Sequence, residues 1–457
     1  MRHFTYASVL LPMAFMALGL APVSWTGSAA QAADLAWDGY TSLRYDQRNA
    51  SLPGGGTASD ADAYGTLRLD MTQPEAQALE FHFMGTVRSD LDGGQNEFGY
   101  SPFEGSGDTG DRQTIGYLYE AHLDVNYLFR AMRQLRLGRQ AGTRDETIYF
   151  DGLAADFALS RNLDTTIYVG RAVHFFEMKG EVEDDALAGI GVDYRPFRPT
   201  RLAFDYLATH DVRDPDTGDE ELDDRQVSLR WWQRFGAKWR GYLRSRHLNE
   251  EPRDTTVSFV GYLADDELIL NGSFFRQHQA QNELSIEFSN YFDVIGRSEP
   301  YDAYDLKLRW LISPHYGLDL GYYTRMLSAD AEEGPFNRDF SRTFLIFDMT
   351  DRIVAGMTVT LVAERWEATT TSTDSTGFDV GYRFSSWGRW ASVNAGTTYS
   401  LYKYDYYTEV GERTEVQTTY VKGKLPVGDS FTVNAGYEQE DGIETFTRLT
   451  AGAKYEF

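Results

Sequence analysis

The chain has 457 residues, no cysteine and a net charge of −26 at pH 7, and it carries 29 tyrosines, 28 phenylalanines and 42 glycines but only 13 prolines. The lack of cysteine excludes disulfides, thiolate chemistry and covalent attachment of c-type haem to this chain, and the strong negative charge argues against nucleic acid as a partner. Many aromatic residues together with many glycines are typical of strands joined by turns.

The N-terminus has the features of a secretory signal peptide. A basic start and an apolar run precede small residues that end at Ala32, which fits the small-x-small rule for cleavage. A membrane anchor is the alternative, but Pro12 and Pro22 interrupt a run that is already short for a spanning helix. We therefore expect residues 1–32 to be removed and residues 33–457 to form one domain, in which no run is apolar and long enough for a spanning helix.

From residue 35 onward the chain repeats one unit, an amphipathic strand followed by a turn. One such strand alternates three apolar residues with three polar ones: Val227, Leu229 and Trp231 with Gln226, Ser228 and Arg230. The two sets lie on opposite faces of a strand. The segments are about 9 to 11 residues long, enough to cross a bilayer with tilt, whereas strands of a soluble sandwich are usually nearer five or six.

Connections between the strands alternate in length, as in outer-membrane barrels with short periplasmic turns and long external loops. Short turns are expected at 74–77, 130–132, 160–163, 196–199, 236, 265–266, 313–315, 351–352, 386–388 and 426–428. Longer polar loops are expected at 49–61, 91–112, 211–223, 278–300, 328–338 and 367–373.

Ten short turns between a first strand at 35–48 and a last strand at 445–457 predict about 22 strands. The range extends down to 18, because the strand at 152–159 is weak and residues 282–293 form either an extra hairpin arm or a loop. An even number of strands places both chain ends in the periplasm.

The last strand carries apolar residues on one face. They are Leu449, Ala451, Ala453, Tyr455 and Phe457. The strand resembles the β-signal that the barrel assembly machinery recognises, with Tyr455 and Phe457 as its aromatic residues. With the signal peptide and the long amphipathic strands, the whole mature chain resembles the porin-like family of Gram-negative outer-membrane β-barrels. The resemblance implies an all-β, transmembrane antiparallel barrel in contact with outer-membrane lipid and lipopolysaccharide.

A shorter resemblance covers residues 135–140 and 150–152. The sequence Leu-Arg-Leu-Gly-Arg-Gln followed by Phe-Asp-Gly is similar to a strand and loop of substrate-specific porins and exopolysaccharide-export barrels. Arg139 falls on the same face as Leu137, so either Gly138 is a bulge that turns Arg139 inward, or the register differs.

Two loops have compositions that allow a functional interpretation. The glycine-rich and acidic loop 91–112 either folds inward as a constriction or forms an external tip. The acidic run at 214–224 has carboxylates at spacings used by Ca²⁺ loops, but its glycine is displaced relative to the EF-hand pattern. We interpret it as a solvated loop.

The less apolar face of the strands is expected to line the lumen. The predicted pore-lining residues are Arg68, Asp70, Arg88, Glu120, Asp124, Arg230, Arg234, Arg240, Arg244, Arg246, Lys307, Arg309, Asp319 and Arg325. The five arginines between positions 230 and 246 form a basic ladder on two adjacent strands. Opposed basic and acidic walls filter solutes by charge and dipole; the alternative is that these charges only keep a polar interior neutral.

No catalytic pattern is present. The chain lacks Gly-x-Ser-x-Gly, and its eight histidines have no metal-binding spacing, so we expect no enzyme, no cofactor and no metal site. The sequence favours a porin or channel for passive or substrate-selective diffusion of small hydrophilic solutes.

The alternative function is a structural sleeve around a partner such as a periplasmic multihaem cytochrome in an electron conduit. Barrels of 16 to 18 strands normally enclose an aqueous channel, whereas 22-stranded ones are usually plugged, and the mature chain has almost nothing before its first strand. The strand count therefore discriminates between the two functions, since 18 strands would leave only the porin.

Overall fold

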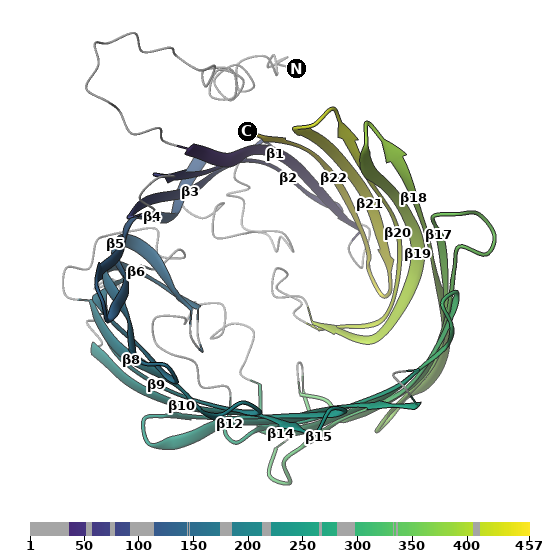
Figure 1. The fold of residues 1–457 in the computed structure, drawn as a ribbon. Coiled ribbons are helices and arrows are strands. Elements are labelled where there is room, and N and C mark those ends of the chain that lie inside the picture. The colour runs from purple at the N-terminus through teal and green to yellow at the C-terminus, as the bar shows by residue number, and fades with distance from the viewer. Residues whose placement is uncertain are drawn as a thin grey trace.

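The alternating sequence folds into one closed antiparallel barrel (Figure 1). The computed structural model describes residues 36–51, 57–73, 78–91, 114–143, 145, 147–173, 185–212, 221–264, 267–280, 298–331, 333–334, 337–404 and 412–457. Each strand pairs with its neighbours along the chain, and β1 pairs with β22 to close the ring. Within the described residues no helix is long and apolar enough to cross a membrane.

The described residues form 22 strands. They are β1 (Ala36–Ser51), β2 (Thr57–Thr72), β3 (Leu79–Asp90), β4 (Thr114–Phe129), β5 (Met132–Thr143), β6 (Thr147–Ser160), β7 (Leu163–Ala172), β8 (Ala186–Phe197), β9 (Thr200–Val212), β10 (Glu221–Phe235), β11 (Trp239–Leu248), β12 (Glu251–Leu263), β13 (Leu268–Gln277), β14 (Tyr301–Ser313), β15 (Tyr316–Leu327), β16 (Phe340–Thr350), β17 (Met357–Ala368), β18 (Ser372–Ser386), β19 (Arg389–Tyr404), β20 (Glu412–Val427), β21 (Phe431–Asp441) and β22 (Thr445–Glu456). The predicted fold class and the count of 22 are confirmed.

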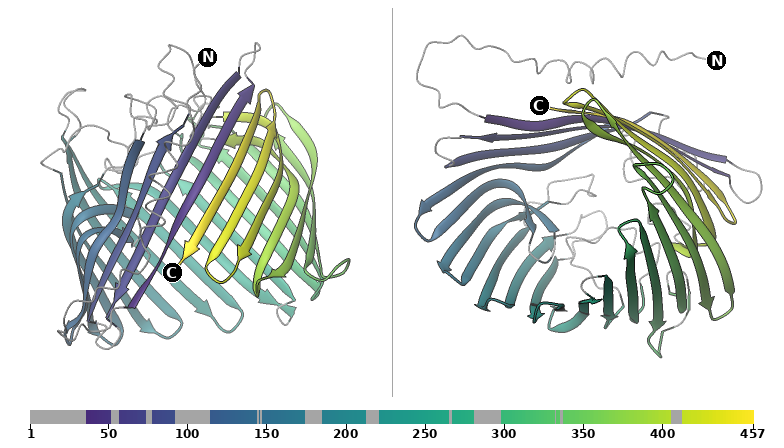
Figure 2. Two further views of the ribbon diagram at one scale, coloured as in Figure 1. Left: turned by 90° about the horizontal axis from the view of Figure 1, so that it is seen from above. Right: turned by 45° about the vertical axis from the view of Figure 1, so that its right-hand side comes forward.

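The predicted short connections are found: they join β2 to β3 and every second pair after it up to β20 and β21, all at one end of the tilted strands (Figure 2). The predicted alternation in length holds only in part, because residues 144–146, 249–250, 369–371 and 442–444 are short connections at the opposite end. The weak strand at 152–159 is a full strand, β6. Of the sequence-based expectations, the signal peptide at 1–32, the arm or loop at 282–293, the acidic run at 214–220 and almost all of loop 91–112 lie outside the described residues.

Three predicted loops are wrong in their bounds, because the strands on either side continue further. β1 and β2 pair as far as Ser51 and Thr57, so little remains of the loop expected at 49–61. The expected loops at 211–223 and 367–373 shrink in the same way. Polar residues indicate a loop in a soluble strand protein, but a barrel wall that rises above the bilayer faces water on both sides and accepts polar residues on either face.

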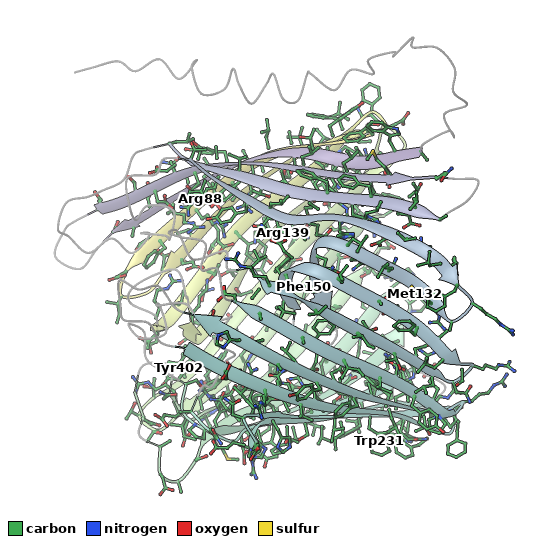
Figure 3. All side chains as sticks on the ribbon, turned by 90° about the vertical axis from the view of Figure 1, so that its left-hand side faces the viewer. Arg88, Met132, Arg139, Phe150, Trp231 and Tyr402 are labelled. Atoms are coloured by element: carbon green, nitrogen blue, oxygen red, sulfur yellow. The ribbon has the colours of Figure 1, made fainter. Side chains whose placement is uncertain are left out.

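The outer face carries the apolar half of each strand, with tryptophans near the end that has the short turns. Trp37 on this face is 59% exposed, and Trp231, Trp239 and Trp310 are exposed on the same face, as Figure 3 shows for Trp231. Aromatic residues gather at the two interfaces of a membrane, where an amphipathic ring contacts both headgroups and acyl chains. This end of the barrel therefore has the composition of a membrane boundary.

A row of three glycines crosses β5, β6 and β7. Gly138 faces Gly152, which faces Gly170 in the next strand. A Cβ on Gly152 would lie 2.1 Å from the carbonyl oxygen of Val169, and Gly138 has a φ of +119°, so neither position accepts a side chain without strain. Beyond this row the β5–β6 hairpin turns into the barrel (Figure 1).

Candidate lumenal site and constriction

The strand register places all fourteen predicted pore-lining residues on one face of the sheet. On β14 and β15, for example, Lys307 faces Gly321 and Arg309 faces Asp319, whereas the exposed Leu306 and Leu308 between them face Tyr322 and Leu320. Because successive residues of a strand alternate between faces, the charged set lies opposite the apolar outer surface. The inner wall of the barrel is therefore charged.

Most of these charges lie in cross-strand ion pairs. Arg88 Nε lies 2.9 Å from Asp62 Oδ1, and Lys307 Nζ lies 2.6 Å from Asp319 Oδ2. The carboxylates of Asp62 and Asp319 are buried while their basic partners are more exposed, which leaves the cations closer to the water-filled space. An array of such pairs keeps the wall nearly neutral overall, but with its positive ends directed toward a solute.

The predicted basic ladder is present as a contiguous set of side chains. Arg230 faces Arg244 and Arg234 faces Arg240 across β10 and β11. Arg230 hydrogen-bonds Asp205, and Arg244 lies 3.5 Å from Asp254. Within the part of the chain that the structure describes, Arg234 and Arg240 have no carboxylate partner, although the Arg240 guanidinium lies 5.3 Å from the centre of the Tyr262 ring. The ladder therefore presents uncompensated positive charge mainly at the short-turn end.

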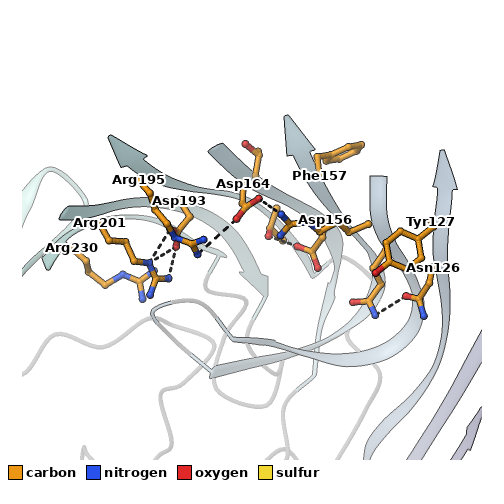
Figure 4. Close-up of a pocket in the computed structure, with 13 residues that line it drawn as sticks. Asn126, Tyr127, Asp156, Phe157, Asp164, Asp193, Arg195, Arg201 and Arg230 are labelled. Atoms are coloured by element: carbon orange, nitrogen blue, oxygen red, sulfur yellow. Dashed lines mark hydrogen bonds and ion pairs between the residues drawn. The ribbon is translucent and has the colours of Figure 1, made fainter. Parts of the chain in front are cut away.

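A pocket of about 520 Å³ opens beside the ladder on the inner wall of β4 to β10 (Figure 4). Arginine and aspartate side chains alternate along it: Arg133 Nη2 lies 2.7 Å from Asp164, and the Arg201 guanidinium hydrogen-bonds Asp193. Arg201 also lies 4.4 Å from the centre of the Trp232 ring, which holds the guanidinium plane in place. The pocket is lined by both signs of charge and can take a small polar solute.

Sequence analysis missed the three arginines that line this pocket beside Arg230. Arg133, Arg195 and Arg201 all lie within a few residues of short turns. The alternation pattern alone places Arg195 and Arg201 on the inward face of β8 and β9. It assigns Arg133 to the face of Leu135, because the register irregularity between Met132 and Gln134 that lets Arg133 reach Asp164 has no sign in the sequence.

The inward-folded end of the β5–β6 hairpin narrows the lumen. Asp145, between β5 and β6, lies 3.8 Å from Arg230 Nε on β10. Phe150 and Ile148 on β6 are buried in an inward-facing apolar cluster with Leu187, Leu207 and Leu248 of β8, β9 and β11. The hairpin thus crosses in front of the strands between β6 and β10 and packs on their inner faces. This constriction was not predicted from the sequence.

Arg139 does not turn inward. The pairing of β4 with β5 is regular at this point, with Ala121 facing Arg139 and His122 facing Gly138, so the suggested bulge at Gly138 is wrong. Arg139 stays on the face of Leu137, where its Nε donates to Asp151 Oδ1 at 2.8 Å (Figure 3). An acidic partner directly opposite on β6 compensates the outward charge.

Comparison with known proteins adds solved barrels of similar extent. No family model and no curated protein matches the sequence. One similar solved structure is a BenF-like porin from Pseudomonas fluorescens Pf-5, which is 10% identical over 92% of this chain and 98% of that chain, with a TM-score of 0.45. Another is the translocation pore of the P pilus usher PapC, which is 10% identical over 91% of this chain and 99% of that chain, with a TM-score of 0.48. A third is OccAB3 of Acinetobacter baumannii, which is 10% identical over 92% of this chain and 99% of that chain, with a TM-score of 0.47. At these values no functional property is transferred to this chain.

Proposed function

We propose that this protein is an outer-membrane channel of the porin type, through which small hydrophilic solutes diffuse with a preference for anionic ones. The observation that carries the proposal is the combination of an arginine-lined pocket with a hairpin of the same chain folded across the lumen beside it. The aromatic residues at the short-turn end support a membrane location, with those turns in the periplasm.

The hairpin matters because a barrel of this size without an inward element is too wide for its wall charges to select among small solutes. Its 22 strands, spaced ~4.8 Å apart and tilted by ~40°, give a backbone ring roughly 44 Å across. A charged wall acts on a solute only within about one Debye length, ~8 Å at physiological salt. By bringing Asp145 to Arg230, the hairpin places part of this chain inside the lumen beside the pocket and reduces the free cross-section there.

Reconstitution of the purified barrel in planar bilayers tests the channel. We expect discrete conductance steps and a reversal potential that reports anion preference in a salt gradient. A purified, folded barrel that conducts no ions would contradict the proposal.

The strand count keeps the sleeve function as a second candidate, because a barrel of 22 strands has room for a partner. Against it, the inward apolar cluster around Phe150 is buried by this chain alone. Affinity purification from native membranes separates the two: a stoichiometric periplasmic protein with haem absorbance supports the sleeve, and a barrel recovered alone supports the channel.

Three further parts of the proposal concern biogenesis and surroundings. Residues 1–32 act as a secretory signal peptide, and residues 33–457 form the mature barrel. Tyr455 and Phe457 present the terminal aromatic residues to the barrel assembly machinery. In the membrane, the outward apolar surface contacts lipid and, in the outer leaflet, lipopolysaccharide.

A further inference from the structure

Four potential metal ligands lie together on the inner wall of β3 and β4. His82 faces His122 and Glu80 faces Asp124 across the strand pair, so two residues from each strand form a square on one face. His82 Nε2 lies 3.6 Å from Glu80 Oε2 and 3.7 Å from Asp124 Oδ2, and His122 Nδ1 lies 3.2 Å from Asp124 Oδ1. His82, His122 and Asp124 thus bring their ligand atoms together, and Glu80 lies beside His82.

The separations match those around a small divalent ion. With ligand distances of ~2.1 Å, the edge of a tetrahedral site is about 3.4 Å. One ligand atom from each of His82, His122 and Asp124 lies within 4.8 Å of the other two, so small side-chain rotations suffice to close the site. Sequence spacing gave no sign of it, because the two histidines are far apart in the chain and only the register joins them.

His82 is already oriented as a ligand by a second carboxylate. Its Nδ1 lies 2.6 Å from Asp70 Oδ1 on the neighbouring strand β2, directly opposite in register. A carboxylate on one ring nitrogen fixes the tautomer and directs the lone pair of the other nitrogen outward, as in the carboxylate–histidine–metal arrangement of metalloproteins. Here the other nitrogen, Nε2, points at Glu80 and Asp124.

His122 provides the independent sign of a missing partner. The side chain is only 5% exposed, yet Nδ1 makes no hydrogen bond of acceptable geometry despite its proximity to Asp124. A buried, unsatisfied nitrogen costs free energy and calls for an explanation such as a bound ion. An ion held between His82, His122 and Asp124 satisfies it.

We propose that Glu80, His82, His122 and Asp124 bind one divalent transition-metal ion of the Zn²⁺ class in the wall of the lumen. Two imidazoles with two carboxylates suit such borderline ions, whereas Mg²⁺ and Ca²⁺ prefer oxygen ligands alone. The proposal is independent of the channel function, because its test measures ion binding to the whole folded barrel.

Arg136 competes with the ion for the carboxylate of Asp124, so a change at Arg136 should alter metal affinity in a specific direction. Its Nε donates to Asp124 Oδ1 at 2.9 Å and its Nη2 to Oδ2 at 3.2 Å. The guanidinium therefore occupies the same carboxylate that the ion needs. Removing the guanidinium takes a positive charge and two donors away from Asp124, while Gln134 Nε2 still donates to Oδ2 at 2.9 Å. This should strengthen metal binding, whereas loss of a merely structural ion pair has no reason to do so.

The experiment is a Zn²⁺ titration of the purified full-length barrel by calorimetry, with Co²⁺ absorption as a second readout of tetrahedral nitrogen and oxygen ligation. We expect one ion per barrel, not displaced by excess Ca²⁺. His82→Gln and His122→Gln should each weaken binding by at least about tenfold, and Asp70→Asn by about 10-fold to 100-fold through loss of the oriented imidazole. Arg136→Gln should tighten it.

His247→Gln is the matched control, since His247 lies on β11 well away from the square and is expected to leave binding unchanged. Heat-modifiable migration of each variant verifies that it is folded. Absence of stoichiometric Zn²⁺ binding in the folded wild type overturns the proposal. So does equal binding by the wild type and both histidine variants, or weaker binding by Arg136→Gln.

Discussion

Gly39 and Phe457 join the two ends of the chain through a pair of backbone hydrogen bonds. Gly39 N donates to Phe457 O at 3.2 Å, and Phe457 N donates to Gly39 O at 3.1 Å. A Cβ on Gly39 would lie 3.1 Å from Cζ of the Phe457 ring, so the ring lies against the bare backbone of β1. The last residue of the chain is therefore part of the seam that removes both free edges of the sheet.

Deletion of Phe457 should lower the amount of folded barrel in the outer membrane severalfold, because it removes both the terminal aromatic residue and two seam hydrogen bonds. Heat-modifiable migration of membrane fractions measures this. Phe457→Tyr keeps the ring and the backbone and should assemble normally, as should Arg240→Gln, which alters only a lumenal charge. Normal levels of the deletion variant would show that the terminal residue is dispensable.

The short turns are expected on the periplasmic side. Because the chain has no cysteine, a single introduced cysteine is a unique label. Cysteine at Asp330, between β15 and β16, should react with an impermeant maleimide on intact cells. Cysteine at Arg198, in the turn between β8 and β9, should react only after the outer membrane is opened. The reverse labelling pattern would show that the short turns lie on the external side of the membrane.

The uncompensated part of the basic ladder should set ion selectivity. Arg234→Gln combined with Arg240→Gln should shift the reversal potential toward cations, with a change of about twofold or more in permeability ratio at 0.1 M salt and much less at 1 M, where the Debye length falls to about 3 Å. Arg276→Gln is the matched control, since Arg276 is paired with Asp302 on the outer face. An unchanged ratio in the double variant would place the ladder outside the permeation path.

Local sequence determines most of the barrel, and register determines the site. The period-two pattern and the turns follow from neighbouring residues, so the 22 strands and the inward set of charges could be predicted. The square of His82 and His122 could not, because it depends on which residues of β3 and β4 face one another. The inward bend depends on Gly138, Gly152 and Gly170 meeting in one row, and each glycine alone resembles an ordinary weak point of a strand.

The folded-in hairpin should control the size of the pore. Gln140 and Phe150 face each other across β5 and β6, so residues 141–149 can be replaced by Asn-Gly, a two-residue hairpin turn that preserves the pairing below it. This removes Asp145 and its contact with Arg230. We expect severalfold higher single-channel conductance and faster entry of larger sugars in liposome swelling, since the lumen loses its covering element but keeps its wall.

Two milder variants locate the cause of that change. Asp145→Asn keeps the hairpin and weakens only its ionic contact with Arg230, so it should raise current fluctuations more than mean conductance. Replacing the external turn at 369–371 by Asn-Gly shortens a connection that joins β17 to β18 at the same end of the barrel, and should leave both unchanged. If the hairpin deletion conducts like the wild type, the narrowest point lies elsewhere in the lumen, and the pocket beside Arg230 is then not where solutes are selected.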